Sequence, residues 1–76
     1  MLPWWSEELE RLDGHKIRAR LESLGLPAWK VAALLDIHPM TLSKYMTGVM
    51  RCSPTRRRQL ERALCLKDGE IVLVAH

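Results

Sequence analysis

The sequence predicts one mostly α-helical domain of four to five helices, with a central helix-turn-helix and a short C-terminal β-strand. Three observations support this fold class. Apolar residues recur at helical spacing along most of the chain. Prolines and glycines stand where helices of ordinary length would begin and end. Residues 70–75 are rich in β-branched side chains, which favour a strand. We therefore expect residues 1–76 to form a single domain, with a core in residues 15–66 and a strand or tail in residues 70–76.

The chain begins with a helical pattern. Ser6 is a good N-cap for a helix through residues 7–12, whose acidic first turn suits the helix dipole. Asp13 can then cap a fresh helix, which we expect to end at Gly25. One bent helix and two short helices both fit this pattern.

Two short amphipathic helices joined by a turn of three or four residues are predicted between Pro27 and Gly48. Pro27 and Pro39 each suit the first turn of a helix, and Gly48 suits the end of the second. Because so short a connection keeps the two helices from lying antiparallel, they must cross at a steep angle. This is the helix-turn-helix arrangement, in which the second helix can stand out into a DNA major groove.

A further helix is predicted from Thr55 to Leu66, followed by a turn and the strand at 70–75. A lone strand has no sheet to join in a helical domain. It can pack as an apolar tail, pair with an N-terminal segment, or pair with another chain. We favour another chain, so the segment is a predicted homodimer contact. The residues of that contact are Ile71, Val72, Leu73 and Val74.

The net charge of +3 favours an acidic partner. The charge is unevenly distributed. The charged residues within 1–13 are mostly acidic, whereas those within 51–62 are mostly arginines. This asymmetry predicts one face for solvent and another for phosphate. The alternative is that Arg56, Arg57 and Arg58 simply solvate a helix.

Several classes of function find no support in the sequence. Cys52 and Cys65 are isolated from each other and from the histidines, so no metal site is predicted. There is no Gly-rich phosphate loop and no triad-like grouping, so we expect no enzyme, no catalytic residue, no cofactor and no small-molecule ligand. No apolar run approaches the ~20 residues of a membrane span, so no membrane association is expected. Isolated, reduced cysteines are typical of a cytoplasmic protein.

Residues of the central region carry a resemblance to a known family. Gly25 stands where the family has the first residue of a Gly-Leu-Thr-Gln run, and Ala32 falls on the small position where two helices meet. Leu42 falls on the buried site of the second helix, and Gly48 on its terminating glycine. Over about residues 17–66 the chain resembles the lambda-repressor/Cro-like helix-turn-helix family of phage and bacterial transcription regulators.

The chain also departs from this family. Asp36 replaces the usual turn glycine, and aspartate tolerates left-handed backbone angles better than most residues. Ala28 replaces a glutamine that helps clamp a phosphate in the family, so that contact is either lost or moved to Lys30. Leu21 and Met46 stand where many members pair an arginine with a glutamate. Replacing a buried ion pair by two apolar groups is often neutral or stabilising, so this paired change fits the alignment.

The resemblance implies a DNA-binding transcription regulator of Cro or small-repressor type, with residues 39–47 as the recognition helix. Such a protein would bind double-stranded DNA sequence-specifically as a dimer, in the cytoplasm of a bacterial host and on its nucleoid. The alternative is an antitoxin or small protein-interaction module that binds a partner protein through its C-terminal tail.

The predicted base contacts are the outward residues of the recognition helix. Lys44 is the strongest candidate, because lysine donates to guanine O6 and N7. The other outward residues offer few groups that can form two hydrogen bonds to one base, so recognition of DNA shape should supply part of the specificity. The alternative is that Thr41, Ser43 and Lys44 form an ordinary solvated helix face that contacts no DNA. The full set is Pro39, Met40, Thr41, Ser43 and Lys44.

Phosphate contacts are predicted around the motif, in the helix before the turn, in the loop after the recognition helix and at the start of the last helix. Their cationic and hydroxyl groups suit the DNA backbone. The residues are Lys30, His38, Thr47, Arg51, Ser53, Thr55, Arg56 and Arg57.

Overall fold

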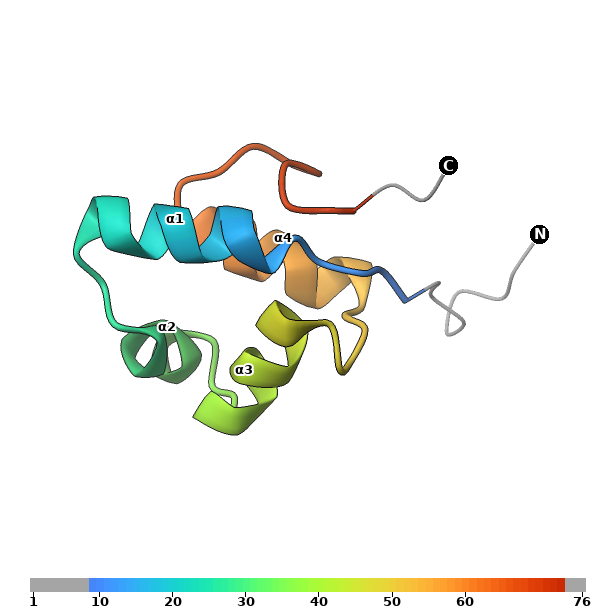
Figure 1. The fold of residues 1–76 in the computed structure, drawn as a ribbon, viewed down its shortest axis with the longest axis horizontal. Helices are drawn as coiled ribbons and strands as arrows, with labels where there is room; N and C mark the ends of the chain where they lie inside the picture. Colours follow the sequence, from blue (N-terminus) through green and yellow to red (C-terminus); the bar gives the residue numbers. More distant parts are fainter. Residues whose placement is uncertain (1–8, 74–76) are drawn as a thin grey trace.

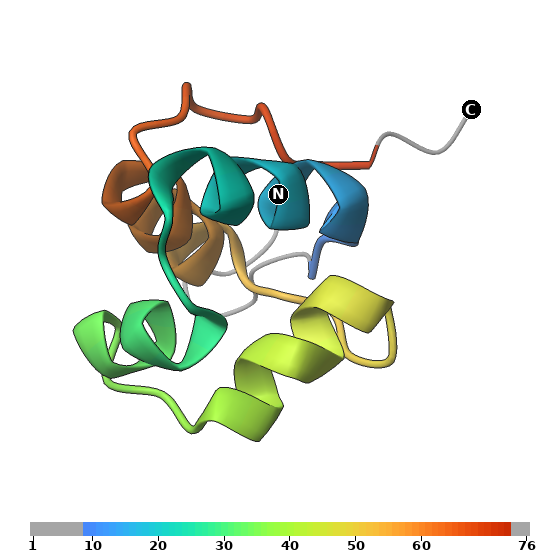
Figure 2. The same cartoon turned by 60° about the vertical axis from the view of Figure 1, so that its left-hand side comes forward.

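The computed structural model describes residues 9–73, which form four helices around one core (Figure 1). Figure 1 and Figure 2 agree that α2 and α3 lie on one side of α1, while the segment after α4 passes over the other. The helices are α1 (Gly14–Leu24), α2 (Ala28–Leu34), α3 (Pro39–Thr47) and α4 (Pro54–Ala63). The buried core consists of Leu12, Ile17, Leu21, Val31, Ala32, Leu42, Cys52, Leu60, Leu64 and Ile71.

Helix α1 is bounded by the signals that the sequence contains. The Oδ1 atom of Asp13 accepts hydrogen bonds from the backbone N–H groups of His15 (3.1 Å) and Lys16 (3.2 Å), which makes it the N-cap. Gly25 ends the helix in the left-handed conformation, with φ of 65°. The predictions of a fresh start at Asp13 and an end at Gly25 are confirmed.

The prediction that residues 7–12 are helical is wrong for the part that the structure describes. Glu10 forms an antiparallel bridge with Cys52, and Leu12 forms another with Val72. The backbone of Glu10 donates to Cys52 O (2.7 Å) and accepts from Cys52 N (2.8 Å). These non-local bonds, together with the burial of Leu12 in the core, outweigh a local helical preference of a few tenths of a kcal/mol per residue. The proposed cap Ser6 lies outside the described residues.

The expected C-terminal strand is also corrected. Among residues 9–73 no strand forms, and the tail makes one isolated bridge, from Val72 to Leu12. The N–H of Leu73 donates to Arg11 O, and the N–H of Asp13 donates to Ile71 O, both at 2.8 Å. The described tail therefore pairs with the N-terminal segment of its own chain, which is one of the three expected alternatives, and Ile71 is fully buried in the core.

The central helices follow the predicted boundaries closely. Helix α2 begins one residue after Pro27, which serves as its N-cap, and Pro39 is the first residue of α3. Asp36 in the turn has φ of 56°, and Gly48 ends α3 with φ of 79°. Ala32 is fully buried, as expected for a small residue where helices meet closely.

Helix α4 is shorter at its C-terminal end than predicted. It begins at Pro54, where the Ser53 hydroxyl oxygen accepts a hydrogen bond from Arg56 N (3.2 Å). It ends at Ala63, because Cys65 takes a left-handed conformation with φ of 56° and turns the chain. The N–H of Leu66 then donates back to Glu61 O (2.8 Å), which closes the helix end. In the described part of the chain, no helix is both long enough and apolar enough to cross a membrane.

Candidate nucleic-acid interface

One face of α3 is exposed along the whole helix. Met40, Ser43, Lys44 and Thr47 follow one another at the i, i+3, i+4, i+7 spacing of a single helical face, and all four are exposed. The opposite face carries Leu42, which is fully buried. A helix whose apolar face packs on the core and whose opposite face is open to solvent has the geometry needed to enter a DNA groove. We call Met40, Ser43, Lys44 and Thr47 the α3 stripe.

The structure places the five predicted base contacts on the first turns of α3. Pro39, Met40, Ser43 and Lys44 are exposed, and Thr41 is half-buried. Met40 leaves 58% of its surface exposed, although a methionine of the core would be covered. Lys44 is the only cation of the five.

His38 caps α3. Its Nδ1 accepts a hydrogen bond from Met40 N (3.0 Å), so the imidazole carries its proton on Nε2 while the cap is in place. The side chain is exposed. The Nε2–H group is therefore a donor at the start of α3, as a phosphate contact requires.

The other predicted phosphate contacts divide by exposure. Lys30, Arg51 and Thr55 are exposed, and so is Thr47, whose hydroxyl donates to Ser43 O (3.0 Å). Ser53 is half-buried and uses its hydroxyl oxygen as the α4 cap.

Arg56 is half-buried and connects two helices. Its Nη1 group donates to Leu35 O at the end of α2 (2.9 Å) and to Gln59 Oε1 (3.2 Å). This arginine therefore holds the end of α2 against α4, and it contributes to the position of the turn that follows.

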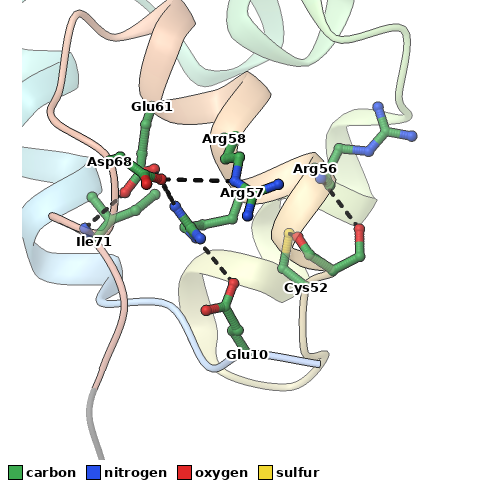
Figure 3. Close-up of polar contacts among 9 residues, drawn as sticks. Glu10, Cys52, Arg56, Arg57, Arg58, Glu61, Asp68 and Ile71 are labelled. Atoms are coloured by element: carbon green, nitrogen blue, oxygen red, sulfur yellow. Dashed lines mark hydrogen bonds and ion pairs between the residues drawn. The ribbon is translucent and has the colours of Figure 1, made fainter. Parts of the chain in front are cut away.

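Arg57 does not belong to the surface. Only 6% of it is exposed, and carboxylates surround its guanidinium (Figure 3). Its Nε donates to Glu10 Oε1 (2.9 Å), and its Nη1 donates to Glu61 Oε1 (2.7 Å) and to Asp68 Oδ1 (2.5 Å). The prediction that Arg57 contacts phosphate is corrected, because the side chain is buried and its Nε and Nη1 groups donate to carboxylates of the domain. We call Arg57, Glu10, Glu61 and Asp68 the Arg57 cluster.

The Arg57 cluster joins the segment before α1, which is distant in sequence, to α4 and to the turn that follows α4. Glu10 lies before α1, Arg57 and Glu61 lie on α4, and Asp68 lies in the turn after α4. Glu61 is 2% exposed, and its second oxygen accepts a hydrogen bond from Ile71 N (3.3 Å). Burial acts to lower the pKa of Arg57, but hydrogen bonds to the three carboxylates outweigh it, so the pKa is raised and the charge is secured.

Sequence reasoning missed this cluster, although one signal was present. Positions 57, 60, 61 and 64 have the spacing of a single helix face, and Leu60 and Leu64 belong to the core. Arg57 and Glu61 therefore sit on the buried face of α4, as an i, i+4 pair of opposite charge. Charged residues on an apolar stripe indicate a buried ion pair.

The described residues contain no group of three or more histidines, cysteines or acidic residues that could hold a metal ion. Cys52 is buried, and burial raises the pKa of its thiol to about 11. Its Sγ donates to Ser53 O (3.4 Å). Cys65 is exposed.

No model of a protein family, no curated protein and no solved structure matches this chain. The structure establishes a small four-helix all-α domain.

Proposed function

We propose that the protein is a sequence-specific double-stranded DNA-binding transcription regulator of Cro or small-repressor type, with α3 as its recognition helix. The observation that supports the proposal is the α3 stripe. It is an exposed face of three polar residues and Met40 on a short helix, which is fixed from behind by Leu42 and joined to α2 by a tight turn. DNA-binding helix-turn-helix domains present their second helix to the major groove in this way.

Charge around the helix-turn-helix supports the same proposal. Between Pro27 and Pro54 the only acidic residue is Asp36, against Lys30, Lys44 and Arg51. The three cations are exposed. A surface with this balance attracts the DNA backbone, and each phosphate contact adds to the salt dependence of binding.

Base readout would rest mainly on Lys44. Its ammonium group can donate to guanine O6 and N7, while the Met40 side chain can contact a thymine methyl group. Ser43 can reach a base edge or a phosphate. Since the stripe offers no arginine, asparagine or glutamine, direct readout is modest, and DNA shape supplies part of the specificity.

Two copies of the domain on one operator would read half-sites about 34–36 Å apart, one helical turn of DNA. Ile71 belongs to the core of its own chain and cannot form part of a dimer contact without leaving it. Val72 is half-buried, Leu73 is 46% exposed, and Val74 lies outside the described residues. A dimer contact through the tail would thus begin at Leu73. The burial of Ile71 also weakens the alternative that the protein binds a partner protein through its C-terminal tail, because this residue of the tail is already packed in the core.

Selection of bound sequences from a random double-stranded DNA library tests the proposal. We expect enrichment of a motif with two-fold symmetry. The matched control is the Lys44→Ala variant, which should enrich a weaker or altered motif. Failure of the native chain to enrich any sequence above the background of beads without protein would reject the proposal.

A further inference from the structure

A groove of about 620 Å³ lies between the start of α1 and the end of α3. Arg11, His15 and Arg18 line one side of it, and Thr47 and Gly48 line the other. None of these residues except Thr47 belongs to the predicted interface. The groove therefore brings a second set of basic side chains to the end of the recognition helix.

The two arginines of this groove are available to a ligand. Both are exposed, and neither forms an ion pair with any residue in the range 9–73. Arg11 extends over the end of α3, since a Cβ built on Gly48 would lie 3.6 Å from both Nε and Nη2 of Arg11. Asp13 also lines the groove, but its Oδ1 already accepts two backbone hydrogen bonds as the α1 cap.

The groove is continuous with the candidate DNA interface. Thr47 is the last residue of the α3 stripe and also lines the groove. A DNA strand that borders the major groove beside α3 would therefore pass from the stripe onto Arg11 and Arg18. The apolar side chain of Met46, which also lines the groove, can pack against a deoxyribose.

We propose that this groove binds a phosphate of the DNA backbone, which extends the DNA interface from the helix-turn-helix onto the start of α1. The inference rests on the proposed function. Guanidinium groups are suited to the site, because each presents paired N–H donors to phosphate oxygens. Positive charge that faces an open groove, rather than an enclosed cavity, suits a continuous backbone better than a small free anion.

The test compares the salt dependence of DNA binding by the native chain and by the double variant Arg11→Gln/Arg18→Gln. Each lost phosphate contact reduces the slope of log Kobs against log salt by about 0.9, so the double variant, which removes both guanidinium groups that hold this phosphate, should lose about 0.9 per bound domain. Its preferred DNA sequence should stay the same, because phosphate contacts carry no base information. The matched control is Arg58→Gln/Arg62→Gln, which removes two exposed charges from α4 and should leave the slope unchanged.

Further variants separate charge from folding. Arg11→Lys/Arg18→Lys keeps both charges and should keep most of the slope. If the double glutamine variant does not fold by circular dichroism, the single variants give the same test, each with a loss of up to about 0.9.

The outcomes separate the two proposals. A native chain that binds DNA with the same salt slope as Arg11→Gln/Arg18→Gln overturns the groove proposal and leaves the proposed function standing. A slope that falls equally in the α4 control also overturns it, since the effect would then belong to net charge. A native chain that binds no DNA overturns the proposed function itself.

Discussion

Gly14, the first residue of α1, lies directly against the backbone carbonyl group of Met46 near the end of α3. A Cβ added at Gly14 would overlap the Met46 carbonyl oxygen, and the nearest neighbours are all backbone atoms of Met46. Backbone atoms cannot move aside as the end of a flexible side chain can. The position of α3 relative to α1 therefore depends on the absence of a side chain at residue 14.

Gly14→Ala should destabilise the domain by about 1–3 kcal/mol, as overpacking commonly does. In an unconstrained helix the same change stabilises by up to about 1 kcal/mol, so the sign of the effect is diagnostic. Urea unfolding measures it, with Ser23→Ala on the exposed face of α1 as the control. A Gly14→Ala variant as stable as the native chain would contradict the close approach of the two helices.

Arg57→Met should destabilise the domain by about 3–5 kcal/mol, because it leaves the buried carboxylate of Glu61 without its charged partner. Arg58→Met, one residue away and exposed, should change stability by less than about 0.5 kcal/mol. Thermal unfolding of the two variants side by side provides the measurement. Equal effects would show that the Arg57 cluster does not hold the fold.

Stability should fall in acid partly through Asp68. The hydrogen bond from Arg57 holds the pKa of this carboxyl below its ordinary value. A group whose pKa is lowered by folding stabilises the protein above its unfolded pKa of about 3.9, and that contribution is lost as the pH falls through the folded value. Unfolding of the native chain and of Asp68→Asn, measured from pH 7 to pH 2, should give curves that converge at the acid end. A constant gap between them would contradict the assignment.

The two thiols should differ sharply in reactivity. Cys65 is exposed, whereas Cys52 is buried with its pKa raised to about 11, so it supplies almost no reactive thiolate at pH 8. A thiol-specific chromogenic reagent should modify one cysteine of the native chain and both in denaturant. In the Cys65→Ser variant the native reaction should disappear. Rapid modification of Cys52 in that folded variant would mean that the core opens there.

Alkali should destabilise the domain through Cys52. Its pKa is raised by burial, so the stability that it contributes is intact below the unfolded pKa of about 8.5 and declines as the pH rises toward about 11. Urea unfolding between pH 8 and pH 11 measures this decline. Cys52→Ala should lower stability at pH 8 and show a weaker decline with pH than the native chain.

Lys44→Ala should weaken binding to the selected DNA site by about 1–3 kcal/mol, the discrimination that one good base contact supplies. Binding to random DNA should weaken much less. Fluorescence anisotropy with both DNAs gives the comparison, and Lys67→Ala removes the same charge from the turn after α4 as a control. Equal losses on both DNAs would assign Lys44 to phosphate instead of base contact.

The sequence was sufficient for the parts of the fold that local chemistry decides. Asp13, Gly25, Asp36, Pro39 and Gly48 all act where short-range rules expected a cap, a turn or a helix start. Each depends on the conformational preference of one residue and on hydrogen bonds to near neighbours. The outward face of α3 is also predictable, because the helical period places it opposite Leu42, which is buried.

The remaining features depend on residues far apart in sequence. Residues 7–12 have acidic side chains that suit a helix start, but Glu10 and Leu12 instead bridge to Cys52 and Val72. Nothing local indicates those partners. Arg57 is predicted at the surface because arginines usually are exposed. The helical period places it beside Glu61 on the buried face of α4, but nothing local indicates its contacts with Glu10 and Asp68. Likewise, Arg11 and Arg18 approach α3 only through the packing of α1.

The bridges from residues 10–12 to Cys52 and Val72 impose an order on biosynthesis. The N-terminal segment leaves the ribosome first, yet its two partners are translated later, and Val72 nearly last of the described residues. Helices α2 and α3 can pack together earlier, since their contacts are close in sequence. The nascent domain therefore lacks the Glu10–Cys52 bridge until residue 52 emerges, and it lacks the Leu12–Val72 bridge until residue 72 emerges. Its fold is completed only when translation of this segment is finished.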